Sequence, residues 1–215
     1  PWIASHAEFL VKSGSELRKQ VHLILEDAKK QHDTYLATGH VTDSLLRSCL
    51  LLAQLDPIFR RKTVVPDLGQ IDMGDLIDLR RLLMKVPSDL FRVHSICLLD
   101  PSFDVGSVLV GGADIDLVLD DALVEIKTTK EPRLQQDHYN QIIGYYLLSR
   151  LGSISGAPKS HIINRVAIYS ARFATLHVFP IEEIASQATF ASFAQWFAAR
   201  AEQEFGIKGR KPLSD

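Results

Sequence analysis

The chain has 215 residues, of which 46% are hydrophobic and 23% are charged, and its formal net charge at pH 7 is −2. These values are typical of a soluble globular protein with one buried core, and they lack the strongly basic character of many nucleic-acid binders. No apolar run approaches the roughly 20 residues of a membrane span. Cys49 and Cys97 lie too far apart for a disulfide framework or a thiolate zinc site. We therefore expect a cytoplasmic protein with no membrane partner.

The first part of the chain, residues 1–95, is predicted to be a helical N-terminal region. Apolar residues at helical spacing predict three helices, at 9–28, 41–55 and 73–84. Thr42 or Asp43 is expected to cap the second of these helices, because both residue types accept hydrogen bonds from free backbone N–H groups.

From residue 96 onward the pattern changes to strands that alternate with helices. Strands are expected at 107–110, in a hairpin over 113–129, at 164–170 and at 175–179, and helices at 133–151 and 181–205. This order predicts an α/β fold with a mixed sheet flanked by helices, in which residues 96–215 form the core and pack with 1–95 into one compact unit. The last helix is expected to pack on this core, and a homodimer interface is the alternative.

The hairpin is the most informative segment. If Asp120 and Asp121 form a two-residue turn, the opposed pairs are Leu119 with Ala122, Leu117 with Val124, and Asp116 with Glu125. Because strand side chains alternate between faces, one face then carries Asp114, Asp116, Glu125 and Lys127, and the other carries Ile115, Leu117, Val124 and Ile126. Two opposed carboxylates repel unless a cation lies between them. The acidic face therefore predicts a divalent-metal site with a lysine beside it.

The predicted helix after the hairpin carries Gln141 and Tyr145, which are four residues apart and hence on one helix face. An acid on one strand, Glu125-Ile126-Lys127 on the next, and Gln141-Ile142-Ile143-Gly144-Tyr145 on the following helix resemble the PD-(D/E)XK nuclease superfamily and its RecB-like branch. The resemblance covers roughly residues 98–180 and implies a restriction-endonuclease-like core.

The first acid of that motif has two candidates, Asp114 and Asp116, and the two-residue turn favours Asp116. Ile115 stands where the motif has proline, a departure that the superfamily tolerates. Members often take another acid from the helix before the sheet, and some RecB-like members add a histidine. The corresponding candidates are Asp43, Asp56 and His40, for which capping or solvation is the alternative.

The resemblance implies a role for each site residue. Asp116, Glu125 and the Ile126 carbonyl would hold Mg²⁺ (or Mn²⁺), since hard cations prefer oxygen ligands. Lys127 would orient the attacking water and stabilise the pentavalent phosphorus. Gln141 would contact the metal-bound water or Lys127, and Tyr145 would contact the backbone phosphate.

Together these residues predict a metal-dependent nuclease that hydrolyses DNA phosphodiester bonds, in DNA processing or in defence against foreign DNA. The alternatives are a hydrolase of RNA or another phosphate ester, and a non-catalytic nucleic-acid-binding or scaffold module on the same fold. Because the chain begins at Pro1, we treat it as a fragment or a processed form. An upstream domain or a separate partner protein would then be a second partner beside DNA.

Overall fold

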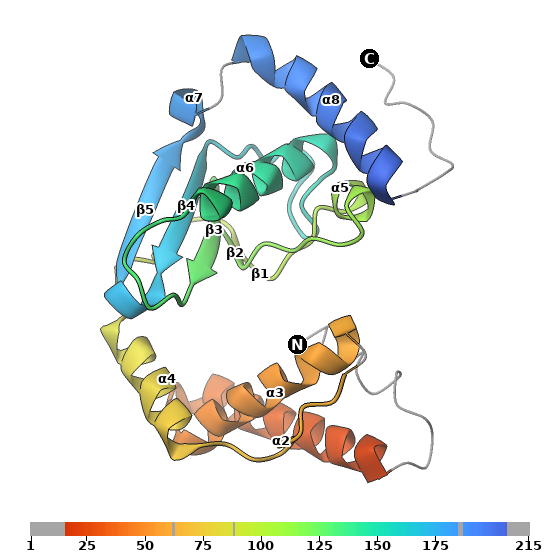
Figure 1. The fold of residues 1–215 in the computed structure, drawn as a ribbon. Helices are drawn as coiled ribbons and strands as arrows, with labels where there is room; N and C mark the ends of the chain where they lie inside the picture. The colour runs from red at the N-terminus through yellow and green to blue at the C-terminus, as the bar shows by residue number, and fades with distance from the viewer. Residues whose placement is uncertain (1–15, 62, 88, 185–186, 206–215) are drawn as a thin grey trace. The chain divides into compact units, whose positions relative to one another are not determined.

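A computed structural model describes residues 16–61, 63–87, 89–184 and 187–205 (Figure 1). The chain forms two compact units that divide between Met84 and Lys85, rather than the single unit expected. The division lies before the predicted boundary at residue 95, so the segment 85–95 belongs to the unit that contains the sheet. Among the described residues, no helix has both the length and the apolar character needed to cross a membrane.

The first unit is helical, as predicted. Its helices are α2 (Glu16–Thr38), α3 (Asp43–Arg61) and α4 (Met73–Lys85), and the predicted helical residues 9–15 lie outside the described part of the chain. The buried core between α2 and α3 consists of Val21, Ile24, Leu55, Ile58 and Leu68. Of the two expected caps, Thr42 caps α3, since its Oγ1 accepts a hydrogen bond from the Leu45 N–H at 3.1 Å.

The second unit contains a five-stranded mixed sheet, which confirms the α/β class. The strands are β1 (Cys97–Leu99), β2 (Leu117–Leu119), β3 (Ala122–Lys127), β4 (Arg165–Ser170) and β5 (Thr175–Pro180), in the spatial order β1-β2-β3-β4-β5. β3 and β4 are parallel and the other neighbours are antiparallel. The parallel pair requires a crossover, which α6 (Gln136–Leu151) provides.

The hairpin between β2 and β3 has the predicted pairing, with Leu117 opposite Val124 and Leu119 opposite Ala122. Asp120 enters the left-handed region at φ 51°, which aspartate tolerates better than most residues. The predicted face of Ile115 is wrong, because this side chain is buried in the same cluster as Val118. Regular pairing with β3 begins only at Leu117, so the strict alternation of faces does not extend back to Ile115.

The strand expected at 107–110 is also wrong, since Val105–Leu109 forms the short helix α5. Gly106 allows this helix to approach α6 so closely that a Cβ atom there would lie 2.5 Å from the Leu148 carbonyl oxygen. The buried Ser107 hydroxyl accepts a hydrogen bond from the Phe103 N–H and donates one to the Ala113 carbonyl. The missing strand is β1, whose three residues are too few to show a period.

α6 covers one face of the sheet, and Figure 1 shows α8 (Gln187–Phe205) running outside it. Core residues on this face come from the strands and α6, among them Val118, Leu123, Val166, Ile168, Ile142, Tyr146 and Leu148. Of the two alternatives for the last helix, core packing is observed, because the Phe190 ring lies 5.3 Å from that of Tyr146. The helix expected at 181–205 is described as α7 (Ile181–Ile184) and α8, with residues 185–186 outside the described part.

The opposite face of the sheet packs against the segment that follows the division. Ala122, Val124, Ala167 and Tyr169 contact Val86, Leu90 and Phe91 there. Since Glu125 and Lys127 alternate with Val124 along β3, they belong to the α6 face. The fold thus places the predicted acidic face under the first turns of α6.

Candidate active site

The candidate site lies at the carboxyl end of β3, where Lys127 pairs with Ser170 of β4. Glu125 is 6% exposed, and among the described residues it is the one charged residue that is buried. A buried carboxylate costs free energy unless it is paired and hydrogen-bonded. The groups around Glu125 therefore decide what this site can do.

A chain of hydrogen bonds joins the strand to the helix. Lys127 Nζ donates to Glu125 Oε1 at 2.8 Å and to Gln141 Oε1 at 2.6 Å. Gln141 Nε2 in turn donates to the Tyr145 hydroxyl oxygen at 2.8 Å. The structure thus brings together four of the predicted site residues, and it selects Lys127 as the contact of Gln141.

Asp116 completes this group from the neighbouring strand segment. Its Oδ2 accepts a hydrogen bond at 2.6 Å from the Ile126 N–H, the backbone group between Glu125 and Lys127. Asp114 is half-buried and joins Ser102 through an isolated bridge. The hairpin therefore presents Asp116 directly to the motif, while Asp114 lies one step further from it.

The electrostatics of the site follow from burial and from like charges. Burial raises the pKa of Glu125, the hydrogen bond from Lys127 lowers it, and the charge of Asp116 raises it again. Burial also raises the pKa of Tyr145, and the charges of Glu125, Asp116 and Asp114 add to that effect. The phenol is therefore neutral at pH 7 and keeps its proton as a hydrogen-bond donor.

Two donors of this site have hydrogens to spare. An ammonium group has three, and among the described residues Lys127 uses them on two acceptors, Glu125 and Gln141. The hydroxyl of Tyr145 accepts from Gln141, and within the described part of the chain no acceptor takes its own proton. One N–H and one O–H therefore remain for an anion or for water.

The donor set fits a magnesium ion. Among the described residues there is no group of three or more His, Cys, Asp or Glu side chains that could hold a metal. Asp116 and Glu125 lie close enough to raise the pKa of Glu125 by both charge and hydrogen bonding, and two adjacent carboxylates favour a cation between them. Mg²⁺ commonly uses one or two carboxylates and completes its octahedral shell with water and substrate phosphates. The oxygens of Asp116 and Glu125, with the Ile126 carbonyl, would hold it.

The other candidates belong to the helical unit. Asp43 forms an ion pair with Arg80 of α4, His40 is exposed with its N–H donating to Thr38 Oγ1, and Asp56 lies within α3. Whether any of these three residues joins the site stays a prediction.

One supporting residue was missed by the sequence analysis. Phe103 is fully buried and its ring centroid lies 5.5 Å from that of Tyr145, so it fixes the phenol beside Gln141. Tyr146, the neighbour of Tyr145, points into the core, as expected for one of the two. A lone phenylalanine in an irregular segment carries no period, and only the tertiary contact identifies its role.

No protein-family model, no curated protein and no solved structure matches this chain. Its function is therefore inferred from the geometry of the site.

Proposed function

We propose that this protein is a metal-dependent nuclease that hydrolyses phosphodiester bonds in DNA, on a restriction-endonuclease-like core. The observation that supports it most is the hydrogen-bonded chain Glu125–Lys127–Gln141–Tyr145, with Asp116 bonded to the backbone between the first two. An exposed hairpin ion pair would not need a buried acid, a second acid and a helix that anchors the lysine. DNA processing or defence against foreign DNA is the biological setting that we propose for this chemistry.

Each residue has a role that its surroundings support. Asp116 and Glu125 would hold Mg²⁺ or Mn²⁺, which would supply Lewis-acid stabilisation and lower the pKa of water. Lys127, held by two acceptors, orients the attacking water and stabilises charge that develops on the phosphate. Gln141 fixes the position of Lys127, and the neutral Tyr145 hydroxyl donates to a phosphate oxygen.

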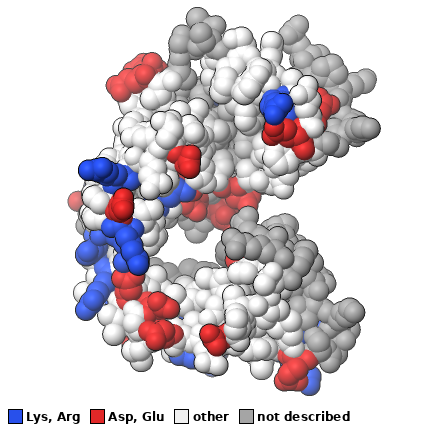
Figure 2. Space-filling view, in the orientation of Figure 1, with Lys and Arg blue, Asp and Glu red and all other residues white. Residues whose placement is uncertain are grey.

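The surface next to the site suits a local contact with DNA rather than a broad one. On the visible face of the sheet unit, basic and acidic side chains lie in small separate groups (Figure 2). Lys130 and Arg133 are exposed in the segment after β3. Lys85 donates at 3.2 Å to the carbonyl of Arg172, just after β4. Lys130 and Arg133 follow the end of β3, and Lys85 contacts the segment after β4. Phosphate contacts need only such a local patch.

The test is cleavage by the purified full chain. Plasmid, linear and single-stranded DNA, together with an RNA transcript, would be incubated with Mg²⁺, Mn²⁺ or EDTA. We expect cleavage of DNA that requires metal and is lost in Lys127→Ala and Asp116→Ala. Lys29→Ala is the matched control, because Lys29 forms an exposed ion pair with Asp33 on α2 and its loss should leave the rate unchanged.

Three outcomes would contradict the proposal. DNA binding without cleavage under every metal condition would identify a non-catalytic binding module. Cleavage of RNA but not of DNA would identify RNA as the substrate. Activity that survives in both Lys127→Ala and Asp116→Ala would place the chemistry elsewhere. Circular dichroism of each variant shows whether the fold is intact.

A further inference from the structure

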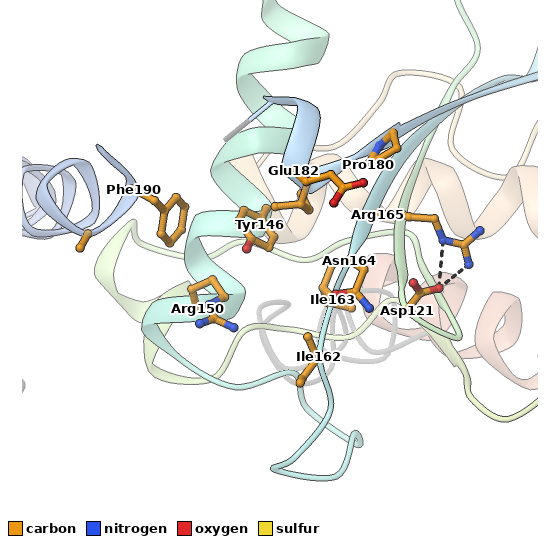
Figure 3. Close-up of a pocket in the computed structure, with 12 residues that line it drawn as sticks. Asp121, Tyr146, Arg150, Ile162, Ile163, Asn164, Arg165, Pro180, Glu182 and Phe190 are labelled. Carbon is orange, nitrogen blue, oxygen red and sulfur yellow. Dashed lines mark hydrogen bonds and ion pairs between the residues drawn. The ribbon is translucent and has the colours of Figure 1, made fainter. Parts of the chain in front are cut away.

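A cavity of about 900 Å³ lies at the end of the sheet opposite the candidate active site (Figure 3). Asp121, Arg165 and Pro180 line it, and Arg165 is the first residue of β4 while Ser170, beside Lys127, is the last. The five residue steps along β4, at about 3.3 Å each, separate the two places by roughly 16 Å. The cavity is therefore a second place for a ligand, not a part of the candidate active site.

Its lining combines aromatic rings with one available cation. The ring centroids of Tyr146 and Phe190 lie 5.3 Å apart, and in Figure 3 both rings lie beside Arg150 on one side of the cavity. On the other side, the Arg165 guanidinium is committed to Asp121, with Nε donating to Oδ1 at 3.0 Å. Arg150 has no hydrogen-bond or ion-pair partner among the described residues. It is therefore the guanidinium with free donors, and such a fork suits an anion.

A smaller cavity of about 210 Å³ shares Arg150 and Ile163 with the larger one. Its other lining residues include Lys159 and His161, and no aspartate or glutamate is among its described lining residues. His161 Nε2 is buried without a hydrogen-bond partner among the described residues. The lining Ser153 hydroxyl donates a hydrogen bond to Asp104. The size and charge of this cavity suit a phosphate group.

We propose that the two adjoining cavities bind a nucleoside phosphate, either free or at the end of a strand. Arg150 and Lys159 bind the phosphate in the smaller cavity, and the base lies against Tyr146 and Phe190 in the larger one. Aromatic faces stack on any base, which makes such a subsite tolerant of sequence. The assignment rests on the aromatic rings that line the larger cavity and on the basic side chains that line the smaller cavity beside it. The volume of the larger cavity lies within the range of small-molecule sites.

Occupation of this site has a structural consequence. Phe190 and Ala191 belong to α8, whereas Tyr146 and Arg150 belong to α6, and all four line the larger cavity. A ligand there contacts both helices and stabilises the packing of α8 on the core. We therefore expect nucleotide binding to raise the melting temperature of the full chain, since a ligand that binds only the folded state stabilises it.

The test is isothermal titration calorimetry of the full chain with EDTA present, so that no metal supports binding at the candidate active site. The two probes are AMP and a 5′-phosphorylated five-residue oligodeoxyadenylate, which distinguish a free nucleotide from a strand end. We expect at least one of them to bind. Its affinity for Arg150→Ala should be at least about tenfold lower than for the wild type, because a charge-assisted hydrogen bond is lost. Arg200→Ala, which removes an exposed arginine of α8 paired with Glu204, should bind like the wild type.

A second variant separates the two subsites. Ala191→Phe fills the wall of the larger cavity and leaves every charged group in place, so it should weaken AMP binding while inorganic phosphate still protects against thermal unfolding. Binding by neither probe at about 1 mM would overturn the proposal, as would equal binding to Arg150→Ala and wild type. Loss of binding in Asp116→Ala, but not in Arg150→Ala, would assign the ligand to the candidate active site. None of these results depends on whether the protein cleaves DNA.

Discussion

The hairpin of β2 and β3 carries acidic residues at both ends, and the surroundings at the two ends shift the pKa of these residues in opposite directions. At the turn, both carboxylates have hydrogen-bond partners. Asp121 pairs with Arg165, which lowers its pKa. The Asp120 carboxylate accepts hydrogen bonds from the backbone N–H groups of His94, Ser95 and Ile96 and from the Ser95 hydroxyl, which also lower its pKa.

At the other end of the hairpin, the acidic residues repel each other. Glu125 is buried, and burial together with the charge of Asp116 raises its pKa although Lys127 opposes the shift. Acidic residues therefore stabilise the fold at the turn, whereas the buried charge of Glu125 at the strand end is unfavourable. Such an unfavourable charge is typical of functional sites, because a bound ligand, rather than the protein, neutralises it. The predictions below test this contrast, from the largest expected effect to the smallest.

The contrast in activity should be the largest effect. Asp116→Asn removes a charge from the candidate active site, whereas Asp121→Asn removes one from the turn. We expect the rate of metal-dependent DNA cleavage to fall about 100-fold or more in Asp116→Asn, the size of effect seen when a single electrostatic contact of a transition state is lost. Asp121→Asn should retain the wild-type rate. Equal rates in the two variants would remove the distinction between the two ends.

The anchoring of Lys127 should have a smaller effect. Gln141→Leu removes one of its two acceptors, and we expect a loss of about tenfold in the cleavage rate, since a catalytic group that is less well placed works less well. Gln136→Leu is the control on the same helix, because the one hydrogen bond that the Gln136 side chain makes with the described residues is to Asn140 on the surface. A wild-type rate in Gln141→Leu would show that Glu125 alone positions the lysine.

The unfavourable charge of Glu125 should be measurable through the free energy of unfolding. Glu125→Gln is expected to raise the free energy of unfolding of the metal-free protein by about 1 kcal/mol at pH 7, because the neutral amide removes the burial cost and the repulsion from Asp116 that raise the pKa of Glu125. A raised pKa means that the native state is most stable while Glu125 is protonated and loses stability as pH rises through that pKa. Urea unfolding should therefore show the gain at pH 7 and little difference at pH 4. A variant less stable than wild type at pH 7 would contradict the contrast.

The turn should show the opposite sign and the smallest effect. Asp121→Ala is expected to lower the free energy of unfolding by about 0.5 kcal/mol at pH 7, because solvent screens this partly exposed ion pair. The pKa of Asp121 is lowered from 3.8. Its contribution is therefore present above that value and is lost as pH falls through the lowered one. Urea unfolding at pH 7 and at pH 2.5 would test this, with Asp89→Ala as an exposed control.

Much of the candidate site could be predicted because its determinants are close in the sequence. The length of the Asp120-Asp121 turn decides that Leu117 faces Val124, and the period of two then places Glu125 and Lys127 on one face. The four-residue spacing of Gln141 and Tyr145 places them on one face of α6. The error at Ile115 occurs where a backbone hydrogen bond to Pro101 replaces regular strand pairing, and the error at 107–110 occurs where a short helix packs against α6.

The sequence by itself determined the hairpin, its register and the residue types of a two-carboxylate site, because turn length and side-chain alternation act over a few residues. Only the tertiary structure decided which partners those residues meet. The Asp120 carboxylate is bound by residues 94–96, Lys127 is held by Gln141 across the crossover, and the cavity beside Arg150 is assembled from α6, β4 and α8. Each of these depends on packing between segments far apart in the chain, which no local period encodes.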